Sequence, residues 1–119
     1  MKPLVLVVDD DTAYSECLVT SLAVDGRAEV VGCARDGREA VRRAMVLTPD
    51  VVLMDVHMPV MDGIEAARRL RRLLPAARIV LVSSSTEPGD RKRAANAGAH
   101  AFLPKSVGAY ALVEAVIAS

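Results

Sequence analysis

The sequence predicts an α/β protein built on a doubly wound, five-stranded parallel sheet. Short runs rich in Val, Leu and Ile alternate five times with longer amphipathic stretches, and this (βα)5 order is typical of parallel strands joined by helical crossovers. The short runs are continuously apolar, as expected for strands that are covered on both faces. The 119 residues suffice for one compact domain, residues 1–119, but not for two.

Each expected strand is a short run in which apolar residues follow one another. The strands are Leu4–Val8, Glu29–Ala34, Val51–Met54, Ile79–Val82 and Ala101–Leu103. Each expected helix repeats its apolar residues about every three to four positions. The helices cover about Ala13–Val24, Arg38–Leu47, Ile64–Leu74, Gly89–Ala97 and Gly108–Ala118.

Capping residues mark several helix ends. Asp36 stands three residues before Glu39, and Asp62 three residues before Glu65, which is the spacing of a capping box at a helix start. Asp11 has the position and the side chain of an N-cap for the first helix, rather than those of a metal ligand. Glycines stand where two helices should stop, at Gly26 and Gly98.

Composition excludes several classes of protein. Fifteen basic and fifteen acidic residues give a formal net charge of zero, so the chain lacks the basic excess with which domains bind nucleic acid electrostatically. The first apolar run, Leu4–Val8, is too short for a signal peptide or a membrane span, which predicts a cytoplasmic protein without membrane attachment. Cys17 and Cys33 have neither zinc-site nor disulfide spacing and are expected to be reduced thiols in the core.

Reactive side chains follow four of the expected strands. In chain order they are Asp9, Asp10 and Asp11, then Asp55, Ser83 and Lys105. Because the carboxyl ends of parallel strands meet at one edge of the sheet, we expect these groups to lie together. Carboxylates this close repel one another, and oxygen ligands favour Mg²⁺ or Mn²⁺ over zinc. A cation there, with a hydroxyl and an ammonium facing it, suits phosphoryl transfer onto a carboxylate.

Four segments resemble the signature segments of response-regulator receiver domains, in order and at the spacing of that family. They are Leu6–Asp10, Met54–Gly63, Val82–Ser83 and Leu103–Lys105. The resemblance spans the whole chain. It implies a flavodoxin-like sheet with strand order 2-1-3-4-5. It also implies a signalling phosphoacceptor that assists its own phosphorylation and dephosphorylation, rather than a turnover enzyme.

The resemblance gives each acidic residue of the edge a role. Asp55 would be the phosphoacceptor. Asp10 would bind magnesium directly and Asp9 through a water molecule. Asp55 and the backbone carbonyl of His57 would complete the ligands that the protein supplies. A strand-end carboxylate without this role is the simpler alternative for Asp55, but the flanking Met58 and Pro59 favour the acceptor.

The resemblance also assigns residues that would bind the phosphoryl group and residues that would respond to it. Ser83 and Lys105 would each bind a phosphoryl oxygen. In the family, the inward pull on the hydroxyl opens space for an aromatic side chain three residues before the lysine, which here is Phe102, the only phenylalanine. Ser83 and Phe102 would then form the switch. A static core role for Phe102 stays open, because a phenylalanine on a strand ordinarily belongs to the core.

Two positions do not follow directly from the resemblance. Receivers often have a proline after the lysine, joined by a cis bond, whereas here Pro104 precedes Lys105 and Ser106 follows it, which leaves the loop geometry open. His57 occupies a position that borders, in this family, the path of the water that hydrolyses the phospho-aspartate. It either tunes the lifetime of the phosphorylated state or is a solvent-facing loop histidine without a kinetic role.

The resemblance also implies partners. A cognate histidine kinase would supply the phosphoryl group, and the fourth and fifth helices with the last strand would form a phosphorylation-linked homodimer or bind an output partner. Leu103–Ser106 resembles the ending of receivers in helix-turn-helix transcription regulators, and the chain stops just after the fifth helix, so we expect the receiver of such a regulator. The alternatives are a free-standing receiver and an interaction module that works without phosphorylation.

The haloacid-dehalogenase type of aspartyl phosphotransferase is a competing class. Asp9–Thr12 superficially suggests its first motif. That motif needs threonine or valine four residues after the nucleophile, where this chain has Ala13, and it leaves Asp55 unexplained. The sequence therefore favours the receiver.

Overall fold

The computed structural model describes residues 1–85 and 87–118, and five strands alternate with five α-helices along them. The strands are β1 (Leu4–Val8), β2 (Glu29–Ala34), β3 (Val51–Asp55), β4 (Arg78–Ser83) and β5 (Ala101–Pro104). The helices are α1 (Thr12–Asp25), α2 (Gly37–Leu47), α3 (Gly63–Leu73), α4 (Pro88–Asn96) and α5 (Ala109–Ile117), and a 3-10 turn, η1 (Lys105–Val107), precedes α5. The predicted elements are confirmed to within one residue at their ends, whereas η1 was not expected.

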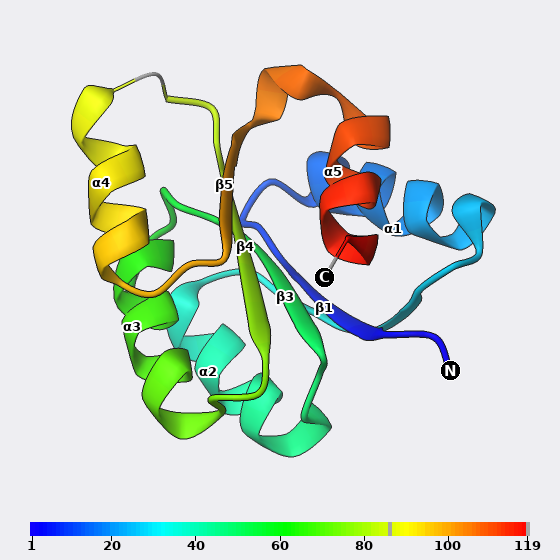
Figure 1. The fold of residues 1–119 in the computed structure, drawn as a ribbon, viewed down its shortest axis with the longest axis horizontal. Helices are drawn as coiled ribbons and strands as arrows, with labels where there is room; N and C mark the ends of the chain where they lie inside the picture. The colour runs from blue at the N-terminus through cyan, green and yellow to red at the C-terminus, as the bar shows by residue number, and fades with distance from the viewer. Residues whose placement is uncertain (86, 119) are drawn as a thin grey trace.

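The five strands form one parallel sheet in the order β2-β1-β3-β4-β5, which confirms the predicted fold and strand order. Figure 1 shows α1 and α5 on one face of this sheet and α2, α3 and α4 on the other. The two strands that carry the predicted acidic residues, β1 and β3, are hydrogen-bonded neighbours near the middle of the sheet. The fold thus brings the ends of β1 and β3 together.

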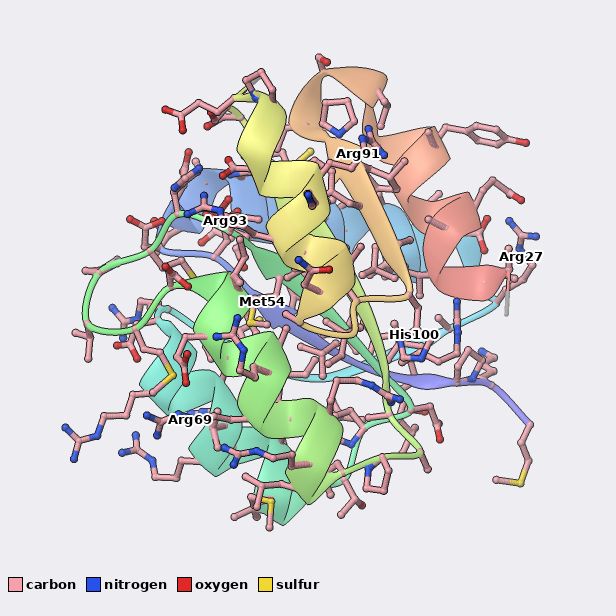
Figure 2. The ribbon with its side chains drawn as sticks, turned by 60° about the vertical axis from the view of Figure 1, so that its left-hand side comes forward. Arg27, Met54, Arg69, Arg91, Arg93 and His100 are labelled. Carbon is pink, nitrogen blue, oxygen red and sulfur yellow. The ribbon has the colours of Figure 1, made fainter. Side chains whose placement is uncertain are left out.

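The core consists of two apolar layers, one on each face of the sheet. Leu6 and Val8 of β1 pack into the layer under α2, α3 and α4, while Val5 and Val7 pack into the layer under α1 and α5. Successive residues of a strand point to opposite faces, so a continuous apolar run fills both layers. Figure 2 places Met54 of β3 in the interior behind α3. This packing fixes the ends of the central strands.

The edge strands differ from the expectation that all strands are covered on both faces. Most residues of β2 and β5 are only half-buried, because each of these strands has a neighbour on one side alone. Cys33, on β2, is exposed, and so is Cys17, which lies off the buried positions Leu18 and Leu22 of α1. The prediction that both cysteines are core thiols is therefore wrong.

The predicted helix caps are present. The carboxylates of Asp36 and Asp62 accept hydrogen bonds from the backbone N–H groups of Glu39 at 2.8 Å and Glu65 at 2.9 Å. Asp11 caps α1 by accepting from the N–H of Tyr14, as predicted. Since a cap fixes where the first helical turn begins, Asp11 also fixes the start of α1 directly after the acidic residues of β1. Gly26 ends α1 in the left-handed conformation, with a φ of 81°.

Candidate magnesium and phosphoryl site

Three carboxylates meet at the carboxyl edge of the sheet. Asp9 and Asp10 follow β1, Asp55 ends β3, and one oxygen of each lies within 4.8 Å of the others. Asp9 and Asp55 are 1% and 5% exposed, whereas Asp10 faces solvent. The Oδ1 atom of Asp55 is buried and has no hydrogen-bond partner within residues 1–85 and 87–118. Oxygen ligands with one unsatisfied buried oxygen fit a hard divalent cation such as Mg²⁺.

Lys105 enters the same cluster from η1. Its Nζ lies 2.8 Å from Oδ2 of Asp9 and 3.7 Å from Oδ2 of Asp55. Burial by itself would lower the pKa of this ammonium, but the hydrogen bond to Asp9 and the charge of Asp55 outweigh burial, so the pKa lies above its ordinary value. The ammonium is therefore charged and stands between two carboxylates.

The Asp55 carboxylate is electrostatically unsatisfied. Burial, followed by the charge of Asp9, raises its pKa to about 6, although Lys105 and a backbone hydrogen bond from His57 act in the opposite direction. One ammonium does not compensate three carboxylates. The remaining negative charge is what a divalent cation would neutralise.

Ser83 and Phe102 lie on neighbouring strands but in different surroundings. Ser83, at the end of β4, is fully buried, and its hydroxyl accepts a hydrogen bond from the N–H of Ser85 at 3.1 Å. Phe102 of β5 is half-buried and packs against the core layer under α2, α3 and α4. The Arg91 guanidinium of α4 lies 5.1 Å from the centre of the Phe102 ring. Phe102 thus forms part of the molecular surface at α4 and β5.

The side chain of His57 contacts α4. Its Nε2 lies 2.9 Å from Oδ2 of Asp90, which is fully buried in the first turn of α4 and also pairs with Arg93. Burial would raise the pKa of Asp90, but Arg93 and His57 outweigh it and hold the pKa below its usual range. The His57 side chain is exposed, and its hydrogen bond to Asp90 ties the loop after β3 to α4.

The sequence reading missed two residues of this region, Asp90 and Tyr14. Asp90 was not singled out in the sequence, although Asp90 and Ala94, four residues apart on α4, are both buried and define its inner face. Tyr14 of α1 has Lys105 Nζ 4.2 Å from the centre of its ring. The sequence around Tyr14 does not predict this contact, because the contact depends on the position of Lys105, which lies near the other end of the chain.

The loop around Lys105 is now defined. None of the peptide bonds in the described ranges is cis, β5 extends through Pro104, and Lys105 opens the 3-10 turn η1. Gly108 ends this turn with a φ of 86° and leads into α5. The turn directs the Lys105 side chain back over the carboxylates.

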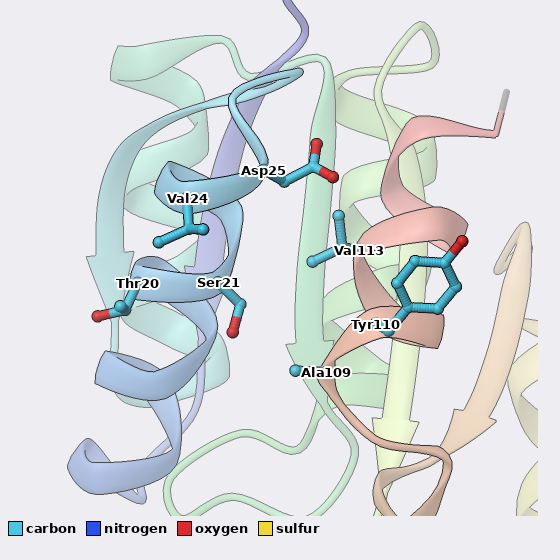
Figure 3. Close-up of a pocket in the computed structure, with 7 residues that line it drawn as sticks. All are labelled: Thr20, Ser21, Val24, Asp25, Ala109, Tyr110 and Val113. Carbon is cyan, nitrogen blue, oxygen red and sulfur yellow. The ribbon is translucent and has the colours of Figure 1, made fainter.

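A separate groove of about 350 Å³ lies between α1 and α5 (Figure 3). Thr20, Ser21, Val24, Asp25, Ala109, Tyr110 and Val113 line it. None of the predicted site residues is among them. The chemistry predicted from the sequence therefore belongs to the carboxylate edge and not to this groove.

Known proteins share this fold and much of this sequence. The response regulator receiver domain family matches residues 5–117. The protein-glutamate methylesterase/protein-glutamine glutaminase 2 of Photobacterium profundum is 45% identical over 107 residues, and the corresponding enzyme of Halalkalibacterium halodurans is 43% identical over 110 residues. These matches cover 88% and 91% of this chain but 27% and 32% of those proteins, so the chain spans about a third of their length or less.

Solved structures of receiver domains have the same fold as this chain. The signal receiver domain of NarL from Mycobacterium tuberculosis has a TM-score of 0.93 and 36% identity, over 98% of this chain and 94% of that one. The response regulator domain of Thermotoga maritima CheB has a TM-score of 0.85 and 32% identity, over 100% and 98%. The chain belongs to the response regulator receiver domain family. Receivers of this family are the phosphoacceptors of two-component systems and are phosphorylated by histidine kinases.

No helix in the described part of the chain combines the length and the apolar character that a membrane crossing requires.

Proposed function

We propose that this receiver accepts a phosphoryl group on Asp55 and works as a phosphorylation-dependent switch. The observation that carries the proposal is the buried Asp55 carboxylate, which lies 3.7 Å from the Lys105 ammonium and has one oxygen without a hydrogen-bond partner among the residues that the structure describes. Asp9, Asp10, Asp55 and the backbone carbonyl of His57 would hold Mg²⁺, or Mn²⁺ in its place. Bound there, the metal would neutralise charge on the transferred phosphoryl oxygens.

The side chains of the site have complementary tasks in this reaction. A carboxylate oxygen of Asp55 forms a bond to phosphorus while the bond between phosphorus and the donor breaks, and the leaving group departs, which is the imidazole of a histidine kinase or the carboxylate of a small acyl phosphate. Lys105 moves its ammonium from Asp9 to a phosphoryl oxygen, and the Ser83 hydroxyl donates to another. Fixed cationic and hydrogen-bonding groups stabilise charge as it develops in the transition state. We place the protein in the cytoplasm, with its histidine kinase.

The test of this function is intact mass spectrometry of the chain after incubation with acetyl phosphate and Mg²⁺. We expect a single phosphate adduct that hydroxylamine removes, because an acyl phosphate is labile to that nucleophile, and that does not form when EDTA removes the metal. Absence of an adduct, together with failure to bind beryllofluoride, would favour an interaction module that works without phosphorylation. Sustained hydrolysis of phosphate monoesters would favour the haloacid-dehalogenase class.

The proposed switch surface consists of α4, β5 and α5. Phe102, Arg91 and Pro104 line a groove of about 270 Å³ there, so a movement of Phe102 would change this surface directly. Withdrawal of the Ser83 hydroxyl toward the phosphoryl group would make room for the ring. We expect beryllofluoride with Mg²⁺ to convert the chain from monomer to dimer, measured by sedimentation velocity. An unchanged sedimentation coefficient at high protein concentration would contradict a dimeric signal.

The output of the switch has two candidates. The resemblance of Leu103–Ser106 to the ending of such receivers supports a helix-turn-helix transcription regulator, in which the receiver itself would not bind DNA. Similarity to the two methylesterases supports a chemotaxis output instead. Disrupting the gene in its host separates them: altered transcript levels would support the first, and altered release of methyl groups from receptors the second. A free-standing receiver would be supported if neither changes.

His57 is expected to lengthen the life of the phosphorylated state. Its hydrogen bond to Asp90 restrains the loop two residues from Asp55, so His57→Ala should loosen the loop, admit water and shorten the half-life of the adduct several-fold. The matched variant His57→Gln, whose amide can donate to Asp90, should restore part of the half-life. The half-life is measured as the loss of adduct mass with time. An unchanged half-life in His57→Ala would show that His57 has no effect on the rate of dephosphorylation.

A further inference from the structure

Tyr14 borders the carboxylate edge without belonging to the set that the family resemblance assigns. It lies in the first turn of α1, where Asp11 caps the helix through the Tyr14 backbone N–H. The ring packs partly into the core layer under α1 and α5, and the Lys105 ammonium lies 4.2 Å from its centre. The face of a tyrosine ring attracts a cation at this separation. Residues 14 and 105 thus meet from opposite ends of the chain.

The hydroxyl group gives no reason for a tyrosine, rather than a phenylalanine, at position 14. Its oxygen is buried and has no hydrogen-bond partner within the described ranges. Burial, followed by the charges of Asp9 and Asp55, raises its pKa to about 12, so the phenol is neutral. A buried hydroxyl without a partner costs stability, and phenylalanine would avoid that cost. The contact that Tyr14 does make in the site is the one between its ring face and Lys105.

Asp9, Asp55 and the ring of Tyr14 lie around the Lys105 ammonium, and a metal would compete with the ammonium for the two carboxylates. Its ammonium contacts Asp9 and lies near Asp55, and both of these carboxylates are also in the cluster that fits Mg²⁺. A divalent cation on those oxygens weakens their attraction for the ammonium and repels it. The Tyr14 ring is neutral and offers no metal ligand, so its attraction for Lys105 does not depend on occupancy of the carboxylates.

We propose that Tyr14 is a positioning residue for phosphoryl transfer to Asp55. Its ring face keeps the Lys105 ammonium over the pocket when the carboxylates bind the cation, so that the ammonium is in place for a phosphoryl oxygen. The four-carbon stem of lysine is flexible, and a side chain released from Asp9 would otherwise sample many rotamers in solvent. The inference rests on the proposed phosphorylation of Asp55.

The test compares Tyr14→Leu, which removes the ring, with Tyr14→Phe, which keeps it and removes the hydroxyl. The rate constant for adduct formation from acetyl phosphate and Mg²⁺ is expected to fall about 3- to 30-fold in Tyr14→Leu, the range that corresponds to a partly desolvated cation–π contact. In Tyr14→Phe it should stay within about twofold of the native value, because the ring face is retained. A native chain that forms no adduct would contradict the proposed function itself, independently of Tyr14.

A second measurement needs neither metal nor phosphate. The ring shields protons above its face, so in the presence of EDTA the ε-methylene protons of Lys105 should resonate upfield in the native chain and in Tyr14→Phe, and at ordinary positions in Tyr14→Leu. Tyr14→Met, with a flexible apolar side chain, should match Tyr14→Leu and serves if that variant folds poorly. Equal phosphorylation rates in the native chain and in folded variants without the ring would overturn the proposal. A fall of the phosphorylation rate in Tyr14→Phe as large as that in Tyr14→Leu would also overturn it.

Discussion

Replacing Asp55 by asparagine is expected to abolish the phosphate adduct completely. The amide has nearly the shape of the carboxylate and can occupy the same buried place at the end of β3, but its oxygen is too weak a nucleophile to attack phosphorus. Intact mass after incubation with acetyl phosphate and Mg²⁺ measures the effect. The matched control is Asp10→Asn, which removes a neighbouring carboxylate of the same cluster but leaves the acceptor. It should still form the adduct, at a higher Mg²⁺ concentration.

Persistence of the adduct in Asp55→Asn would place the phosphoryl group on another residue. Peptide mapping after reduction of the acyl phosphate with borohydride would then locate it. Loss of the adduct in Asp10→Asn at every Mg²⁺ concentration would mean that metal binding, rather than the acceptor, limits the reaction. The Asp55→Asn and Asp10→Asn variants would then be compared by their binding of beryllofluoride.

The same substitution is expected to change the pH dependence of stability in the metal-free protein. The pKa of Asp55 is about 6 in the folded chain and near its ordinary, lower value when unfolded, so between these values the folded state binds more protons. Its contribution to the free energy of unfolding therefore falls as pH rises from about 4 to about 6. At pH 7.5 Asp55→Asn should be more stable than the native chain by about 1 to 2 kcal/mol, a figure reduced for residual solvation.

Urea unfolding in the presence of EDTA measures this difference. The gain of Asp55→Asn should shrink toward zero as the pH is lowered to about 4, where Asp55 of the native chain is protonated in the folded state. Equal stability of the two proteins at pH 7.5 would show that burial and the neighbouring charges do not disfavour the ionised form of Asp55 in the folded state. Added Mg²⁺ should stabilise the native chain more than the variant, since binding to the folded state alone adds to its stability.

Gly63→Ala is expected to cause the largest loss of stability. A Cβ at Gly63 would lie 2.1 Å from the backbone carbonyl oxygen of Asp55 and 3.0 Å from the Cα of Val56, so the start of α3 or the end of β3 must move. The N–H of Gly63 also donates to the Val56 carbonyl at 2.8 Å, which holds the helix start against the strand. We expect a loss of about 2 to 4 kcal/mol in the free energy of unfolding.

Gly89→Ala is the matched control for this prediction. Gly89 lies in the first turn of α4, and a Cβ there would meet nothing within 4 Å. Alanine has the higher helix propensity and restricts the unfolded chain, so this variant should gain about 0.5 to 1 kcal/mol. Urea titrations of the three proteins give both values. Similar stabilities for Gly63→Ala and Gly89→Ala would mean that the contact between α3 and β3 can relax without cost.

Much of the site could be predicted because it depends on strand ends. Buried parallel strands leave a recognisable run of apolar residues, and the next polar residue marks the carboxyl edge of the sheet. Asp9, Asp10, Asp55 and Lys105 follow three such runs, and the structure brings them together. Short-range rules likewise sufficed for the caps at Asp11 and at the starts of α2 and α3, since capping depends on residues within one turn.

The features that were missed or wrong depend on packing between distant segments. Asp90 and Tyr14 gain their roles from His57 and Lys105, which reach them from other elements. The cysteines were placed in the core because a thiol is commonly buried, but the buried side of α1 is set by Leu18 and Leu22, and Cys33 stands on an edge strand. Residue type alone does not determine which face of a helix meets the sheet.

The bond between His57 and Asp90 makes the loop after β3 and helix α4 a coupled pair. Asp90 is fully buried, so a displacement of α4 that separates it from His57 leaves a carboxylate with one partner fewer, whereas a displacement that keeps the bond must carry the loop with it. Coupling of this kind is reciprocal. In the proposed switch, a protein that binds better to one position of α4 would therefore change the affinity of the acidic cluster for Mg²⁺ by the same factor by which Mg²⁺ changes the affinity for that protein.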